Sequence, residues 1–150
     1  MNFWLFKSEP DAFSIDDLKQ KKIEHWDGVR NYQARNYMRD EMKQGDLGFF
    51  YHSSCKQPGI VGIIKIKREA YADFTSWDPE GDYYDPKSSV DNPRWVMVDV
   101  QFVKKFKRVI SLDELKQNRK LQYMQLLKKG NRLSIMPLHA EEWETILALL

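Results

Sequence analysis

The chain has 150 residues, which fits one domain, and its 42% hydrophobic and 31% charged residues exclude a disordered or fibrous protein. The net charge of +2 is too small for a protein that holds a long nucleic-acid duplex through phosphate contacts alone. The single cysteine, Cys55, excludes an internal disulfide and fits a reducing compartment.

No apolar run approaches the roughly 18 residues of a membrane span, and the N-terminus lacks the basic start and the cleavage site of a signal peptide. We therefore expect a cytoplasmic protein, or a nuclear one if the source has a nucleus, with no membrane partner.

The first third of the chain predicts one strand followed by two helices. Residues 3–6 form an apolar run that a proline soon follows, which is typical of a buried strand. Ser14 and Asp17 have the spacing of a capping box, so a short helix begins there. Beyond the segment around Trp26, apolar residues at helical spacing predict a second helix that ends at Gly45.

The middle of the chain predicts three strands and one long loop. Residues 47–51 and 60–67 indicate a strand pair, and residues 95–103 indicate a strand that is apolar on both faces. Residues 73–94 show no periodicity, and a loop of this length in a compact domain is usually functional or mobile. Its six acidic and two basic residues give a net charge of −4, so the remainder of the chain carries +6.

The last part predicts a helix, a strand and a helix. A second capping box begins at Ser111, and the helix that it starts is expected to run toward Gly130. Residues 133–136 are expected to form a strand, and apolar residues from Trp143 onward have the spacing of a last helix. Several loops between strands are too short for crossover helices. We therefore expect an α+β fold whose mixed, mainly antiparallel sheet of about five to six strands is curled or closed into a barrel, with short helices around it.

Three aromatic-rich segments suit a ligand pocket better than a hydrophobic core: residues 25–32, 51–54 and 82–88. Each places ring faces beside amides, hydroxyls or charges, and a pocket that stacks a flat polar ring and bonds its edge needs this mixture. Ordinary structural roles remain open. Trp26 could close the end of the barrel, Asn31 could cap a helix, and Ser8 could be a turn residue.

Metal and nucleophile chemistry have little support in the sequence. His52 and Cys55 form an isolated pair with no second pair of ligands, and no motif that orients a catalytic base surrounds them. No glycine-rich phosphate loop occurs. We expect no cofactor and no metal.

The chain resembles the EVE domain family, a PUA-like group that is similar to the YTH readers of methylated adenosine. The resemblance is carried by ordered segments along the whole chain: residues 4–10, 26–36, 45–46, 51–53, 58–62, 84–88, 93–95 and 132–138. It implies a single EVE domain over residues 1–150, without catalytic activity. Such a domain holds a flipped modified base, a modified cytosine in DNA, in an aromatic pocket.

The resemblance also implies where the base binds. The Lys-Ser pair and the Trp that line the YTH cage match Lys7, Ser8 and Trp26. The base pocket that we expect comprises Lys7, Ser8, Trp26, Asp27, Val29, Asn31, His52, Ser53, Tyr83 and Tyr84. Within it, Tyr84 is expected to face Trp26 across the base. The expected phosphate contacts are Arg30, Arg35 and Lys87.

Two alternatives stay open beside this interpretation. The chain could be a hydrolase of modified nucleosides like the related ASCH group, with Lys7 and Glu9 as a catalytic pair, since residues two apart on a strand share a face. It could also read modified RNA through the same pocket. In each case the partner is a nucleic acid or nucleoside that carries a modified base, and we expect a monomer.

Overall fold

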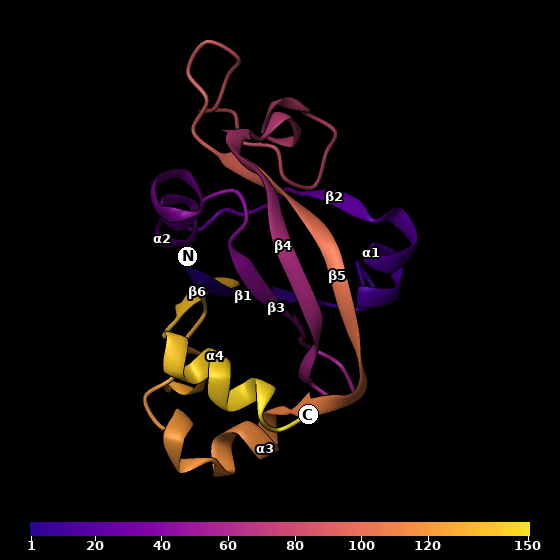
Figure 1. Ribbon diagram of the computed structural model, residues 1–150. Coiled ribbons are helices and arrows are strands. Elements are labelled where there is room, and N and C mark those ends of the chain that lie inside the picture. Colours follow the sequence, from indigo (N-terminus) through magenta and orange to yellow (C-terminus); the bar gives the residue numbers. More distant parts are fainter.

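A computed structural model describes residues 1–150 as one mixed sheet with short helices around it (Figure 1). The strands are β1 (Phe3–Ser8), β2 (Ile23–Trp26), β3 (Leu47–His52), β4 (Gly59–Ala72), β5 (Val96–Ser111) and β6 (Ile135–Leu138). The α-helices are α1 (Ile15–Lys21), α2 (Tyr32–Asn36), α3 (Leu112–Gln117) and α4 (Ala140–Leu147). A π-helical turn, Tyr37–Glu41, continues α2, and the 3₁₀ turns are Phe74–Trp77, Arg119–Leu121 and Gln125–Leu127.

The six strands lie in the order β2-β5-β4-β3-β1-β6. Only β1 and β3 pair in parallel, and the other four pairs are antiparallel. The pairing of β4 with β5 shifts register at four places, and such irregularities bend strands and increase their twist. The predicted α+β fold with a curled, mainly antiparallel sheet of five to six strands is confirmed.

The core forms where the apolar runs of the sequence meet. Trp4, Leu5 and Phe6 are fully buried in β1, which lies between β3 and β6 and so presents both faces to protein. The capping box that begins α1 is present as predicted, and it turns Ile15 and Leu18 into the same core.

Three elements differ from the predictions. Residues 23–26 form an edge strand, β2, in which Trp26 pairs with Val98. β5 continues to Ser111 through lysine-rich sequence, because backbone pairing with β4 does not depend on the exposed side chains there. The helix that begins after Ser111 ends at Gln117, and short 3₁₀ turns replace its predicted continuation.

The loop of residues 73–94 lies between β4 and β5 and forms the tip of the molecule in Figure 1. It is tied together by its own polar groups. The Asp85 carboxylate accepts a hydrogen bond from Trp95 Nε1 at 2.7 Å, and the buried hydroxyls of Ser76 and Ser88 bond each other at 3.2 Å. These bonds give the loop a defined shape, and that shape determines where Tyr83 lies.

Candidate functional site

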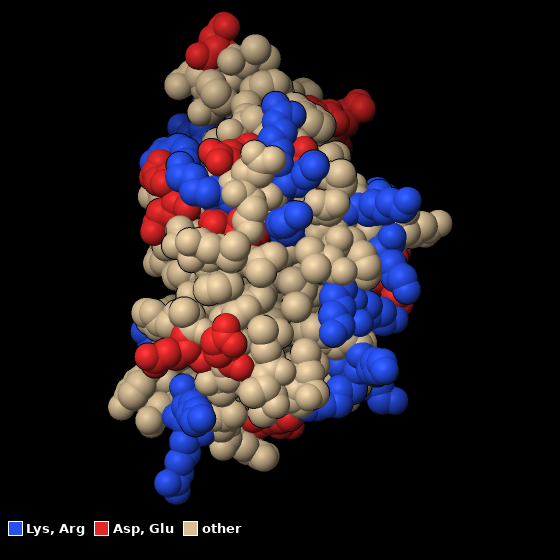
Figure 2. Space-filling model, in the orientation of Figure 1, with Lys and Arg blue, Asp and Glu red and all other residues tan.

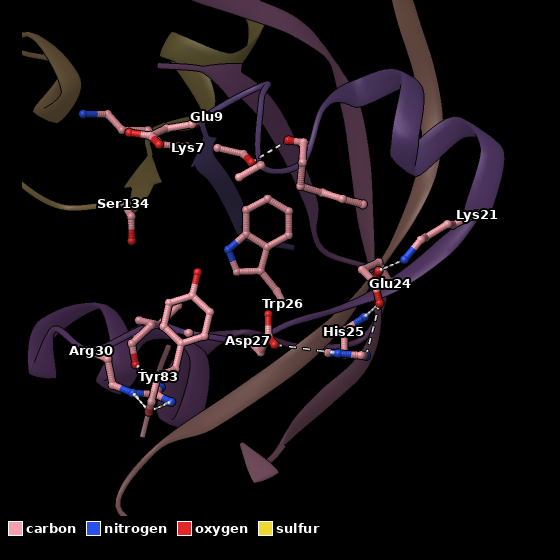
Figure 3. A pocket seen from close by; sticks show the side chains of 15 residues that line it. Lys7, Glu9, Lys21, Glu24, His25, Trp26, Asp27, Arg30, Tyr83 and Ser134 are labelled. Atoms are coloured by element: carbon pink, nitrogen blue, oxygen red, sulfur yellow. Dashed lines mark hydrogen bonds and ion pairs between the residues drawn. The ribbon is translucent and has the colours of Figure 1, made fainter. Parts of the chain in front are cut away.

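A cavity of about 540 Å³ opens between the ends of β1 and β2, the start of α1 and the loop of residues 73–94 (Figure 3). Its volume is within the range of small-molecule sites, which is roughly 300–1,000 Å³. The residues that line it are Lys7, Ser8, Glu9, Ala12, Phe13, Lys21, Glu24, His25, Trp26, Asp27, Gly28, Val29, Arg30, Tyr83 and Ser134.

The Trp26 indole forms one aromatic wall of this cavity. Three rings meet it nearly at right angles: Phe6 at 5.2 Å, Phe50 at 5.6 Å and Phe13 at 6.2 Å between centroids. Only 9% of the residue is exposed, so these neighbours fix the orientation of the ring. Its indole N–H donates to no protein group and is not sealed in the interior. The cavity therefore has a rigid aromatic wall with an unused hydrogen-bond donor.

Tyr83 reaches the cavity from the loop of residues 73–94, and Gly28 allows its close approach. A Cβ atom at Gly28 would lie 2.6 Å from the Tyr83 ring, and the positive φ of +79° at this position also favours glycine. The backbone oxygen of Tyr83 accepts hydrogen bonds from Arg30 Nε at 3.0 Å and from a terminal nitrogen of Arg30 at 2.7 Å. Figure 3 shows the Tyr83 hydroxyl directed toward the cavity near Trp26.

Arg30 joins this loop to the segment that follows β2. Besides Tyr83, its guanidinium donates to the buried carboxylate of Asp73 at 3.0 Å and to Thr75. Burial alone would raise the pKa of Asp73, but hydrogen bonds from Thr75, Gly28 and Arg30 outweigh it and hold that pKa below its usual value. Because its donors are used inside the protein, Arg30 serves as an anchor, and this placement argues against the predicted phosphate contact.

Some polar groups of the cavity have hydrogen-bond partners within the protein, and others do not. Ser8 donates to the Phe13 carbonyl at 2.6 Å, and Glu24 accepts from Lys21 Nζ at 2.7 Å. The Asp27 carboxylate accepts no hydrogen bond from another residue, and the His25 Nε2 atom lies 3.8 Å from one of its oxygens. Burial lowers the pKa of Lys7.

Burial also raises the pKa of Asp27, with further contributions from the charges of Asp73 and Glu24, whereas His25 lowers it. The cavity can therefore accept or donate hydrogen bonds around a planar ligand.

The structure brings together six of the ten predicted pocket residues: Lys7, Ser8, Trp26, Asp27, Val29 and Tyr83. Ser134, from the segment just before β6, also lines the cavity, although it was not among the predicted pocket residues. Phe13 and Glu24 were not predicted either, and His25 was predicted only as part of the aromatic-rich segment of residues 25–32.

The other four predicted residues lie outside the cavity. Asn31 caps α2 by accepting from the Ala34 amide at 3.0 Å, which is the structural role left open for it. His52 Nε2 accepts from the Ile15 amide at 3.1 Å, and burial lowers its pKa. Ser53 does not line the cavity. Tyr84 also lies outside the cavity, and Tyr83 is the tyrosine of this loop that lines it.

The remaining predicted residues are cationic. Arg35 donates to the Arg94 carbonyl at 3.0 Å and lies over the Tyr32 ring at 4.7 Å, so part of its donor capacity is used. Lys87 is exposed and makes no ion pair. Lys7 and Glu9, the pair considered for hydrolysis, both line the cavity, but Glu9 lies beyond the end of β1 and forms no ion pair with Lys7.

Two further findings concern other classes of site. None of the helices is long and apolar enough to cross a membrane. No group of three or more His, Cys, Asp or Glu side chains converges as metal ligands would.

The curled mixed sheet, with an aromatic cavity at the ends of β1 and β2, defines a PUA-like α+β domain. The sequence profile described as "EVE domain" matches residues 2–149, and the chain belongs to this family.

Similar proteins agree with this assignment. Thymocyte nuclear protein 1 from Rattus norvegicus is 50% identical over 167 residues, which cover 99% of this chain and 73% of the relative. A crystal structure of a Pseudomonas syringae protein matches with a TM-score of 0.95 and 52% identity over 98% of both chains. The human THYN1 protein in complex with 5-methylcytosine-containing DNA matches with a TM-score of 0.94 and 48% identity, covering 99% of this chain and 97% of that one.

An ASCH protein from Zymomonas mobilis has a TM-score of 0.56 and 12% identity, covering 99% of both chains. Identity this low shows a shared fold alone.

Proposed function

We propose that the chain binds DNA and holds a modified cytosine, flipped out of the helix, in the Trp26 cavity without chemical turnover. The rigid, partly open indole beside a polar-rimmed hollow carries this proposal. The human relative bound to 5-methylcytosine-containing DNA supports the choice of ligand, because that chain has the same fold at 48% identity. In this proposal residues 1–150 act as one EVE domain and as a monomer.

The energies of the proposed contacts predict which nucleic acids bind best. A base stacked on an aromatic side chain contributes about 1–3 kcal/mol. A buried methyl group adds about 0.8 kcal/mol, so preference for the modified base is modest unless the cavity also bonds its edge. Flipping a paired base costs a few kcal/mol. We therefore expect single-stranded or mismatched sites to bind more tightly than fully paired ones.

Substitution of Trp26 tests the proposal. The probe is a single-stranded DNA oligonucleotide with one 5-methylcytosine, titrated beside the same oligonucleotide with plain cytosine and beside the RNA version. Trp26→Ala should weaken binding of the modified DNA by about 5- to 150-fold, the equivalent of one lost stack.

Trp26→Leu serves as a second variant, since Trp26 also packs in the core, and thermal unfolding reports whether each variant folds. Tyr123→Ala is the matched control, because this exposed tyrosine lies outside the cavity. Equal affinities for modified and plain oligonucleotides, unchanged in both Trp26 variants, would refute the proposal. Tighter binding of RNA than of DNA would favour the RNA alternative.

A hydrolase remains the second candidate, on one observation. Lys7 lines the cavity with a pKa lowered by burial, and Glu9 lines it as well. Incubation of the protein with acetylated cytidine would decide between them. Release of acetate that Lys7→Met abolishes would favour the enzyme, and its absence would favour a binding protein.

A further inference from the structure

Asp27 is the partly buried carboxylate of the cavity that accepts no hydrogen bond from another residue. Glu24 is bonded by Lys21 and by the His25 amide, and Glu9 is exposed at the rim. Asp27 directly follows Trp26, its side chain is 31% exposed, and no other residue donates a hydrogen bond to it. A ligand that covers this carboxylate removes water from it, so a ligand group that donates a hydrogen bond there is favoured.

Figure 3 shows the Asp27 carboxylate next to the Trp26 side chain, on the side where a dashed line joins it to His25. A planar base stacked on the Trp26 indole would present one of its edges to this carboxylate. Asp27 is thus positioned to bond the edge of the base, as carboxylates accept from the exocyclic amine of cytosine in other complexes.

On the basis of the proposed function, we propose that Asp27 reads the Watson–Crick edge of the flipped cytosine, and that binding takes up one proton, which the carboxyl group and the ring N3 share. Cytosine offers an amine donor and, next to it, the N3 acceptor. An ionised carboxylate satisfies the amine but faces the lone pair of N3. With one added proton between the carboxyl oxygen and N3, both hydrogen bonds form, and no covalent bond is made or broken.

The surroundings of Asp27 favour the uptake of this proton. Burial raises its pKa, and the carboxylates of Asp73 and Glu24 act in the same direction. The charged and titratable groups that face it or share its cavity are His25 and Glu24 from β2, Lys7 from β1, Lys21 from α1, Glu9 after β1, and Arg30, Asp73 and Tyr83 from the two loops. Imidazoles in general change charge between pH 5 and 8, so the test must separate His25 from Asp27.

The experiment measures the affinity for a single-stranded oligonucleotide with one 5-methylcytosine from about pH 5 to pH 8. We expect the affinity to fall by about tenfold per pH unit above the pKa of the free site, as the linkage of one proton requires.

Three variants complete the test. Asp27→Asn supplies a permanent amide donor and acceptor, so it should retain binding and remove the pH slope. Asp27→Leu should weaken binding of 5-methylcytosine at low pH. His25→Gln should keep the slope. A flat profile in the native protein, a slope that persists in Asp27→Asn, or a slope lost in His25→Gln would overturn the inference.

These results would refute the role of Asp27 but not the proposed function. The proposed function fails only if binding of the oligonucleotides does not depend on Trp26.

Discussion

Gly28 sets the distance between Tyr83 and the rest of the cavity. Its positive φ and the ring that lies against its Cα together leave no room for a side chain. The backbone conformation of Gly28 therefore determines where the Tyr83 ring, one wall of the proposed site, can lie.

Replacement of Gly28 by alanine should disturb both stability and binding. The left-handed conformation alone costs an alanine about 1–2 kcal/mol. In addition, the new Cβ would overlap the Tyr83 ring, 2.6 Å away, and displace it from the cavity. We expect lower stability in urea unfolding and weaker binding of the modified oligonucleotide.

Gly130→Ala is the matched control. Gly130 has nearly the same φ, +78°, but nothing lies within 4 Å of an added Cβ. Gly130→Ala should lose stability only through the cost of the left-handed backbone conformation. It should bind the modified oligonucleotide as tightly as the native chain does. Equal binding by both variants would show that the position of Tyr83 does not matter to the ligand.

Single residues also show where sequence reasoning succeeds and where it fails. Trp26 and Asp27 line the cavity as predicted, because they lie in the aromatic-rich segment of residues 25–32 and Trp26 matches the tryptophan of the YTH cage. Asn31 and His52 carry the same polar chemistry as pocket residues, but local backbone amides use their acceptors first. Whether a ligand or a nearby backbone amide uses such an acceptor depends on the local geometry. The type of residue alone does not reveal that geometry.

At the scale of elements, the loop of residues 73–94 is held in place by the ion pair of Arg30 and Asp73. Asp73 has no exposed surface, and it accepts from the Gly28 amide at 2.9 Å as well as from Arg30. The same carboxylate thus connects the loop after β4 to the segment after β2.

Removal of one partner should loosen this connection. Arg30→Ala leaves a buried carboxylate without its cation, and we expect a loss of about 3 kcal/mol in urea unfolding. Arg39→Ala, which removes an exposed pair with Asp40, is the control and should change stability little. A similar effect of both substitutions would contradict the anchoring role of Arg30.

The pH dependence of stability provides a separate test of Asp73. Its pKa is lowered in the folded protein, so its contribution is fully present above the unfolded value of about 3.9 and is lost as the pH falls through the lower folded value. The difference in unfolding free energy between the native chain and Asp73→Asn should therefore shrink below about pH 4. A difference that stays constant through this range would rule out the ionised carboxylate as its source.

The elements themselves were predictable to different degrees. β1, β3 and α1 have apolar patterns or caps that specify them locally, and all three were found. β2 has only four residues and a polar sequence, and its strand conformation comes from pairing with β5. Pro137 was expected to end the last strand, but it lies within β6, which is an edge strand where a missing N–H is tolerated.

At the scale of the molecule, charge is unevenly distributed. Figure 2 shows Lys and Arg gathered along one flank of the face in view, and acidic side chains at the tip that the loop of residues 73–94 forms. A small net charge of +2 can thus include a surface that attracts phosphates.

The salt dependence of binding measures how many cations contact phosphates. Lys87 is exposed without an ion-pair partner, and it stays the predicted phosphate contact with the most freedom to act. If it touches phosphate, Lys87→Ala should reduce the slope of log affinity against log salt by about 0.7 on single-stranded DNA. Lys120→Ala, at an exposed position outside the cavity, is the control and should leave the slope unchanged. Identical slopes for Lys87→Ala and the native chain would exclude this contact.

The placement of β1 between β3 and β6 has a consequence for synthesis on the ribosome. Phe3 pairs with Leu47 on one side and with Leu138 on the other, so both edges of β1 are covered only after β6 has been synthesised. Until then the nascent protein exposes an apolar strand edge, a known site of aggregation. Chains stalled before Ile135 should therefore be digested by protease more readily than chains released in full, and they are natural clients for a chaperone.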